Sequence, residues 1–339
     1  MSTIVTSVDF PQVRTLVMQA KPARVRAMFF GTPNIAVPSL EALNTIAEVV
    51  SVVCQPDKPA GRGMLMRPPE VKLAAESLGL TVVQPAKVRG SAFADWVRQQ
   101  NADVALVMAY GRILPQAVLD APRRGCINIH ASLLPKYRGA APINWAIARG
   151  ETETGVCLMQ MDAHMDSGAV LSSRTIQIGA DENAGQLAQR LAEAAAAVVR
   201  DDLMRAIDGE LSAVPQEEAQ ATYAPLITKN DGRIDWSGSA KHVHAHVRGM
   251  TPWPGAFTEL AGRPLKVLGT RMHAGSATRD PGVVVVADPT CVLVACGEGL
   301  LELVQLQLPG KKSMPAGAMV VGRTIRSGDN LGSRPVNLV

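Results

Sequence analysis

The sequence predicts an α/β protein, a doubly wound, mostly parallel sheet of Rossmann-like type followed by a small OB-like β-barrel domain. Between residues 25 and 209, short apolar runs alternate with helical patterns, which indicates right-handed crossover units and a parallel sheet. A polar stretch follows at 211–221. Beyond residue 255 the apolar runs are short and separated by Gly or Pro, a pattern typical of small barrels.

The first of these regions is expected to alternate strands with helices. The expected strands are 25–30, 49–54, 81–83, 104–109, 126–130, 155–161 and 169–178, and the expected helices are 35–47, 70–78, 93–100 and 183–209. In the first helix Val37, Leu40 and Leu43 fall on one face. Ligands of such sheets bind beyond the carboxyl ends of the strands. We therefore look for a site in the loops after residues 30, 54, 109 and 130.

The second region predicts a different architecture. One helical segment is expected at 240–248, and five short strands at 256–260, 265–272, 282–287, 291–296 and 300–306. Five short strands with turns between them suit a small barrel, which often binds oligonucleotides. The predicted division of the chain is an extension outside the fold (1–24), a catalytic domain (25–210), a linker (211–221) and an OB-like C-terminal domain (222–339).

Composition narrows the class of protein. Of the 339 residues, 47% are hydrophobic but only 4% aromatic, so the core must be mainly aliphatic. Apolar runs stay short of the roughly 18 residues needed to span a bilayer, and the first residues lack the apolar core of a secretion signal. The five Cys have no framework or metal-ligand spacing. We expect a cytoplasmic protein with reduced thiols, no membrane association and no metal.

Charge is distributed unevenly along the chain. The net charge is +4, and residues 229–339 carry 13 Lys and Arg against 8 Asp and Glu. A basic C-terminal third favours a polyanionic partner.

The segment 125–146 holds the strongest candidates for chemistry. Asn128 and His130 lie two residues apart at the end of a predicted strand, so their side chains share one face. A solitary His in this place usually bonds only to backbone. The neighbouring Asn128 and the loop Ser-Leu-Leu-Pro that follows favour a functional site instead.

A second polar segment follows a later strand, at 159–168. It contains Asp162, His164 and Asp166. Asp is also common in turns, where it bonds its own backbone, and that interpretation suits Asp162 at least as well as a site role. His164 is expected to be exposed.

These motifs resemble a known family. Asn128, His130, the Ser132–Pro135 loop and Asp166, 36 residues after the His, resemble the formyltransferases that use 10-formyltetrahydrofolate. The strings FFGTPNIAVPSL, QPDKPAGRG, SLLPKYRGAAPINWA, PWPGAF and LQLPGKKSM are similar to the members of this family that formylate initiator methionyl-tRNA. The resemblance covers nearly all of 25–339.

The resemblance implies a site and its partners. It implies catalytic roles for Asn128, His130 and Asp166, and a pocket for the folate co-substrate, 10-formyltetrahydrofolate. That pocket would be made by Ser132, Leu133, Leu134, Pro135 and Gly111, although core packing is nearly as good an account of one of the two Leu. The protein would act as a monomer on initiator methionyl-tRNA.

Two basic groups are candidates for contact with tRNA. Lys58, Arg62 and Arg67 lie in a long Gly- and Pro-containing loop, and Lys311 and Lys312 lie in the C-terminal domain. Such residues suit phosphate contact, although a solvated loop is the plain alternative. More Lys would be expected after Gly63, where this chain has Met64, Leu65 and Met66.

Three other functions deserve comparison. A formyltransferase acting on a small amine, such as an aminosugar nucleotide or glycinamide ribonucleotide, would need no RNA-binding domain. A non-catalytic RNA-binding protein would leave Asn128, His130 and Asp166, here called the polar trio, without a role. A dinucleotide-dependent dehydrogenase would need a Gly-rich phosphate turn after the first strand, but the turn here reads Gly31-Thr32-Pro33-Asn34.

Overall fold

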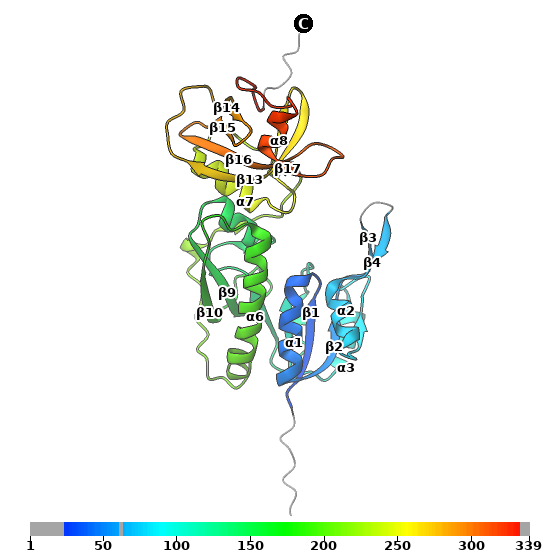
Figure 1. The fold of residues 1–339 in the computed structure, drawn as a ribbon. Coiled ribbons are helices and arrows are strands. Elements are labelled where there is room, and N and C mark those ends of the chain that lie inside the picture. Colours follow the sequence, from blue (N-terminus) through cyan, green and yellow to red (C-terminus); the bar gives the residue numbers. More distant parts are fainter. Residues whose placement is uncertain (1–23, 61–63, 333–339) are drawn as a thin grey trace, which may run out of the picture.

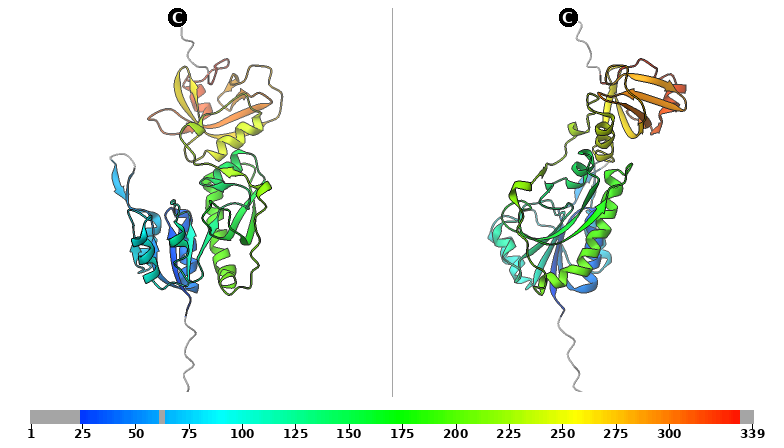
Figure 2. Two further views of the ribbon diagram at one scale, coloured as in Figure 1. Left: turned by 180° about the vertical axis from the view of Figure 1, so that it is seen from behind. Right: turned by 90° about the vertical axis from the view of Figure 1, so that its left-hand side faces the viewer.

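The computed structural model describes residues 24–60 and 64–332 (Figure 1). Apart from Arg24, the predicted extension lies outside the described residues, and so does Arg62. The described chain forms an α/β unit, and a smaller β-rich unit beyond it (Figures 1 and 2). Among the described residues, no helix has the length and apolar character needed to cross a membrane.

A seven-stranded sheet organises the first unit. Its strands are β1 (Arg26–Gly31), β2 (Glu48–Val53), β5 (Val82–Val83), β6 (Val104–Met108), β7 (Cys126–His130), β9 (Glu153–Gln160) and β10 (Val170–Gln177). They lie in the order β10-β9-β7-β6-β1-β2-β5. The five strands from β7 to β5 are parallel, whereas β9 runs antiparallel to both β7 and β10. The predicted doubly wound, mostly parallel sheet is confirmed.

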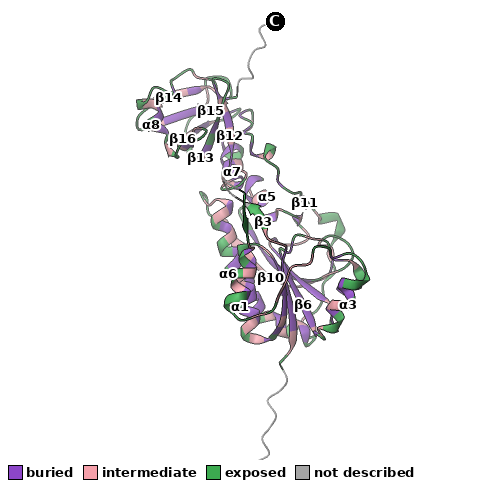
Figure 3. Cartoon of the chain, turned by 90° about the vertical axis from the view of Figure 1, so that its right-hand side faces the viewer, coloured by how far each residue is buried: buried purple, intermediate pink, exposed green. Residues whose placement is uncertain are grey.

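Helices cover both faces of this sheet, so the central strands β1, β6 and β7 are buried on both sides. The helical segments are η1 (Asn34–Ala36), α1 (Val37–Ile46), α2 (Glu70–Ser77), α3 (Ser91–Gln99), α4 (Gln116–Leu119), α5 (Pro142–Ala148) and α6 (Ala184–Ile207). Successive residues of β1 point to opposite cores: Phe29 packs with α1 and α6, and Phe30 with α3. Figure 3 shows the buried strands between helices whose outer faces are exposed.

The longest helix, α6, has a clear start in the sequence. Asn183 caps it by accepting from the backbone N–H of Gln186, and the Gln186 side chain accepts from the backbone N–H of Asn183. Leu187 and Leu191, one turn apart, are fully buried. This face packs on α1, which anchors the helix to the sheet.

The second unit is a curled antiparallel sheet. It contains η3 (Asn230–Gly232), α7 (Ala240–Gly249), β12 (Phe257–Leu260), β13 (Arg263–His273), β14 (Val284–Asp288), β15 (Cys291–Ala295), β16 (Leu300–Gln307), β17 (Met314–Pro315) and α8 (Ala316–Val321). The order is β12-β13-β16-β15-β14, with β17 on β16. Leu331 bridges to Leu260 and Asn330 bridges to Val283, so the chain joins the two sheet edges and gives the barrel-like form that the sequence predicts.

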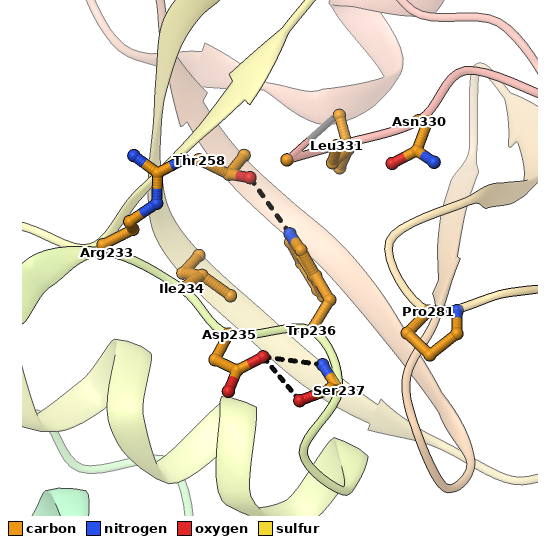
Figure 4. A pocket seen from close by; sticks show the side chains of 10 residues that line it. Arg233, Ile234, Asp235, Trp236, Ser237, Thr258, Pro281, Asn330 and Leu331 are labelled. Atoms are coloured by element: carbon orange, nitrogen blue, oxygen red, sulfur yellow. Dashed lines mark hydrogen bonds between the residues drawn. The ribbon is translucent and has the colours of Figure 1, made fainter. Parts of the chain in front are cut away.

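A cavity of about 500 Å³ lies at this seam (Figure 4). It is lined by Arg233, Ile234, Asp235, Trp236, Ser237, Thr258, Pro281, Asn330, Leu331 and Gly332. The Trp236 indole N–H donates to Thr258 Oγ1 at 3.0 Å and the Ser237 hydroxyl donates to Asp235 Oδ1 at 2.6 Å. These polar groups are therefore satisfied within the barrel itself.

Some short elements differ from the sequence-based expectations. The segment 55–68 was expected to be a loop, but it contains a hairpin of β3 (Lys58–Ala60) and β4 (Leu65–Arg67). The short helices α4, α5 and α8 were not predicted. Two further pieces, β8 (Arg138–Gly139) and β11 (Tyr223–Ala224), form a small parallel pair, and η2 (Glu218–Gln220) precedes β11.

The packing of α6 predicts a large effect on stability. Leu191→Ala should lower the free energy of unfolding by about 2–5 kcal/mol, because it removes fully buried methyl groups and leaves a cavity. Chemical denaturation followed by circular dichroism measures the change. The matched control is Leu226→Ala, at a side chain that is 73% exposed, where a change within about 0.5 kcal/mol is expected. Equal effects at both positions would contradict the packing described here.

Candidate active site

Two polar side chains share one face of β7, near its carboxyl end. Asn128 and His130 are 8% and 6% exposed, and the apolar Ile127 and Ile129 alternate with them. The neighbouring strands β6 and β9 cover both edges of β7. The strand alternation predicted from the sequence therefore places the amide and the imidazole on the same face at the edge of the sheet.

The His130 ring is fixed by a backbone carbonyl. Its Nε2 lies 2.9 Å from the carbonyl oxygen of Tyr137. A carbonyl oxygen can only accept, so Nε2 must carry a proton and donate it. The other nitrogen, Nδ1, faces Oδ2 of Asp166 at 3.7 Å. The imidazole at the end of β7 and the carboxylate from the loop after β9 thus meet, as the sequence analysis expected.

Asp166 adopts a strained backbone conformation. Its φ is 53°, in the left-handed region that costs a non-glycine residue about 1 kcal/mol. Its Oδ2 accepts a hydrogen bond from the backbone N–H of Gly139 at 2.8 Å. Asp162, by contrast, accepts from the backbone N–H of His164 and from the Ser167 hydroxyl, both at 2.9 Å. Asp162 thus shapes the loop and Asp166 faces the imidazole.

The side-chain amide of Asn128 has no hydrogen-bond partner in the described parts of the chain, residues 24–60 and 64–332, although the residue is only 8% exposed. A mostly buried polar side chain ordinarily has a hydrogen-bond partner. Such an amide next to His130 is suited to donate to an oxygen of a bound molecule.

The loop after β7 is anchored by its own backbone. The Ser132 hydroxyl donates to the Lys136 carbonyl at 2.6 Å, and the Leu134 N–H lies 3.4 Å from Cys157 Sγ. Leu133, Leu134 and Pro135 are half-buried. Ser132 is thus bonded within the loop, whereas the next three residues keep part of their surface accessible.

Gly111 lies at the end of the adjacent strand β6. Its φ is 80° and it is exposed. The Gln55 side-chain amide donates to the carbonyls of Tyr110 and Gly111, at 3.1 and 2.9 Å. This bridge joins the ends of β2 and β6 on either side of β1, where the strand order reverses. Gly111 therefore lies at the switch point where ligands of this fold bind.

Other ionisable groups near these strand ends are unsuited to proton transfer. Burial raises the pKa of the Cys54 and Cys157 thiols to about 11 and that of the Tyr110 phenol to about 12. They stay protonated near neutral pH. His is the residue type that exchanges protons in that range, which makes His130 the candidate proton carrier.

The basic candidates fall into two separate places. Lys58 and Arg67 pair across the β3–β4 hairpin and are exposed, and the hairpin projects from the α/β unit (Figure 1). Lys311 and Lys312 are exposed beyond β16, in the other unit. Met64, Leu65 and Met66 are also exposed on the hairpin, at 69%, 70% and 61%. It therefore presents apolar as well as basic surface.

Sequence reasoning missed one group of residues beside the site. Arg138 is buried, and its guanidinium bonds to Gln216 and Glu218 at 3.0 and 2.8 Å. Gln216 in turn bonds to the Asp166 loop. The sequence gave only a weak indication of this group, namely an Arg between Tyr137 and Gly139 in the candidate segment 125–146.

Comparison with known proteins identifies the family. Residues 24–202 match the family described as formyl transferase, and residues 226–324 match formyl transferase, C-terminal domain. The chain belongs to the formyl transferase family. It is 57% identical over 310 residues to a protein of Sorangium cellulosum named methionyl-tRNA formyltransferase, covering 91% of this chain and 100% of that one. A Myxococcus xanthus protein of the same name is 46% identical, over 90% and 97% of the two chains.

Solved structures share the fold of this formyl transferase at low sequence identity. An N-formyltransferase from Helicobacter canadensis, solved with folinic acid and dTDP-3-aminofucose, matches with a TM-score of 0.64 at 15% identity, covering 82% of this chain and 98% of that one. HypX from Aquifex aeolicus, solved with tetrahydrofolic acid, matches with a TM-score of 0.58 at 18% identity, covering 94% and 50%. These likenesses confirm the fold.

The bridge at the switch point predicts unequal effects of two glycine substitutions. Gly111→Ala and Gly79→Ala both place a side chain at positive φ, which costs about 1 kcal/mol. At Gly111 the added Cβ also lies 2.8 Å from Gln55 Nε2, whereas at Gly79 it meets open space. We expect Gly111→Ala to lower the free energy of unfolding by about 1–2 kcal/mol more, from the two disrupted hydrogen bonds. Equal denaturation midpoints would contradict the role of Gln55.

Proposed function

We propose that the protein transfers the formyl group of 10-formyltetrahydrofolate to the free amino group of initiator methionyl-tRNA, giving N-formylmethionyl-tRNA. The observation that carries the proposal is the meeting of Asn128, His130 and Asp166 at the carboxyl edge of the sheet. Relatives that match along nearly their whole length and bear the name methionyl-tRNA formyltransferase support the choice of substrate.

Folate would be held at the edge of the sheet between β6 and β7. Gly111 leaves room for a flat ring, and Leu133, Leu134 and Pro135 offer half-buried apolar surface beside His130. The unpartnered amide of Asn128 fits a carbonyl-type oxygen. When bound, the co-substrate supplies a formyl carbon that the amine attacks, with negative charge developing on the formyl oxygen.

Asn128 acts on the formyl oxygen, and His130 acts on the nitrogen that leaves. The Asn128 amide donates to the formyl oxygen, and a donor of this kind stabilises the transition state by about 3 kcal/mol. With Nε2 committed to the Tyr137 carbonyl, Nδ1 is the nitrogen of His130 free to hold or deliver a proton. It can give that proton to the departing nitrogen.

Asp166 acts through charge and position. Its carboxylate faces His130 Nδ1 at 3.7 Å, which places a negative charge beside the nitrogen that would carry the proton. It can also accept the proton that the attacking amine releases, through a water. The Gly139 N–H keeps the carboxylate turned toward the imidazole.

Contact with tRNA is proposed for both basic groups. Lys58 and Arg67 on the hairpin, with Arg62 between them in the sequence, would meet the acceptor end. Lys311 and Lys312 would meet phosphates along the C-terminal domain (222–339). Positively charged, exposed side chains on two units suit a long polyanion better than a small amine. A cytoplasmic monomer accords with this role.

The first experiment tests the reaction and its proton carrier. The protein is incubated with 10-formyltetrahydrofolate and methionyl-tRNA, and the released aminoacyl group is weighed by mass spectrometry. His130→Ala should lower kcat/KM by about 10²–10⁴-fold, because the proton carrier is lost. His164→Ala removes an exposed His and should behave as wild type. Formylation of an aminosugar nucleotide but not of methionyl-tRNA would contradict the substrate, and wild-type turnover by His130→Ala would contradict the site.

The second experiment tests the hairpin. Lys58→Ala/Arg67→Ala should weaken tRNA binding and reduce the slope of log Kd against log salt by up to about 2, one for each lost phosphate contact. Binding is measured by fluorescence titration across salt concentrations. Lys87→Ala/Arg89→Ala removes the same charge from exposed positions elsewhere. An identical slope change in both double variants would show that net charge, and not the hairpin, decides binding.

A further inference from the structure

Residues 214–224, here called the crossing segment, connect α6 with the C-terminal unit along the candidate site. At its start, Val214 exchanges two backbone hydrogen bonds of 2.9 Å with Val170. At its end, β11 pairs with β8, and the N–H of Arg138 donates to the Thr222 carbonyl at 2.8 Å. The sequence analysis read most of it as a plain linker. In the structure, its start bonds to β10, which follows the loop that carries Asp166, and its end bonds to β8, which lies in the connection after His130.

Gln216 connects this segment to the Asp166 loop. Its Nε2 donates to the carbonyls of Asp166 and Gly168, at 2.8 and 2.7 Å. Its Oε1 accepts from Arg138 Nε at 3.0 Å. All the polar atoms of this side chain are therefore used between the two loops that face each other across the site.

Thr222 connects the same segment to the His130 side. Its hydroxyl oxygen accepts a hydrogen bond from the backbone N–H of Tyr137 at 2.9 Å. The carbonyl of that same residue accepts from His130 Nε2. One residue of the segment therefore holds the group that orients the imidazole, and another holds the loop that carries the carboxylate.

Apart from Ala224, which is buried against Tyr137 and Ala146, the crossing segment is held in place mainly by hydrogen bonds. Val214, Pro215 and residues 217–220 are exposed. Glu218 adds an ion pair of 2.8 Å to the buried Arg138. Arg138 Nη2 is buried without a partner among the described residues, so the guanidinium depends on Gln216 and Glu218 for its interactions. The position of the crossing segment is therefore set mainly by its hydrogen bonds and its ion pair.

We infer that the crossing segment is a positioning element for formyl transfer, with Gln216 and Thr222 as its positioning residues. The inference rests on the proposed function. Asp166 lies in a strained backbone conformation, and its carboxylate stands 3.7 Å from His130 Nδ1. Without the two bonds from Gln216 the loop can relax and carry the carboxylate away. A displacement of about 1 Å in such a site can cost up to about 100-fold in rate.

Three variants of the full chain test the role of Gln216. Gln216→Leu removes all three bonds, and Gln216→Glu keeps an acceptor for Arg138 but cannot donate to the two carbonyls. Both should lower kcat by about 10- to 100-fold with KM for either substrate changed less than about twofold, because substrate binding is not what is lost. Gln220→Leu is the matched control, since Gln220 lies on the same segment and, among the described residues, its side chain bonds only to Glu217.

Thr222→Val extends the test to the His130 side. It removes the acceptor for the Tyr137 N–H at nearly constant volume, and it should lower kcat in the same way. Wild-type kcat in both Gln216→Leu and Thr222→Val would overturn the inference. So would equal losses in Gln220→Leu and Gln216→Leu, or a loss confined to KM, because either would indicate a general structural role.

Amide hydrogen exchange separates this inference from the proposed function. The Gly139 N–H donates to Asp166 Oδ2, so it should exchange at least about tenfold faster in Gln216→Leu than in wild type or Gln220→Leu. This readout needs no turnover. Absence of formyl transfer in the wild type would overturn the proposed function alone, whereas unchanged exchange at Gly139 would overturn the positioning role whatever the reaction.

Discussion

The hydrogen bond between His130 Nε2 and the Tyr137 carbonyl is the interaction on which the rest of the site depends. It decides which ring nitrogen carries the proton and turns the other one toward Asp166. Tyr137 itself has a φ of 62°, in the left-handed region, so its surroundings must hold it there. Its hydroxyl donates to Glu151 at 2.7 Å and Arg149 lies over its ring at 5.3 Å. Burial and the Glu151 carboxylate both raise the pKa of this phenol, which keeps it a donor.

The fold brings the components of the site together by simple means. Parallel strands end at one edge of the sheet, which places the loops after β6 and β7 side by side. The strand β9 runs antiparallel to β7 and ends beside Ile127, near the amino end of β7, so the loop after it must fold back along the sheet to bring Asp166 to His130. The crossing segment joins the loops after β7 and β9 from outside. The site is therefore a product of strand order first and of a few specific hydrogen bonds second.

Much of this architecture could be predicted from the sequence because it follows from periodicity. The apolar runs located the strands, and the alternation in 126–130 placed Asn128 and His130 on one face. The pairing of His130 with Asp166 needed the family resemblance, since no local rule relates residues so far apart. The roles assigned to the site residues, and the domain boundaries, stay predictions.

The features that were missed depend on tertiary contacts. The β3–β4 hairpin has three-residue strands with Pro59 in one of them, and so short a pattern does not separate a strand from a loop. The seven residues of α5 were missed because the sequence around them was examined for catalytic residues and not for helical periodicity. No pattern in the sequence points to Gln216, because its amide matters only through the two carbonyls that the fold places beside it.

The state of the His130 ring is the most direct test of this account. Nitrogen-15 spectra of histidine-labelled protein, with the His130 signals assigned by their loss in His130→Ala, show which ring nitrogen bears a proton. The account predicts a proton on Nε2 at every pH at which the fold persists. It also predicts that the nitrogen-15 signal of Nδ1 changes when Asp166 is replaced by Asn. A neutral ring with its proton on Nδ1 and a bare Nε2 would contradict the hydrogen bond to Tyr137 and the arrangement built on it.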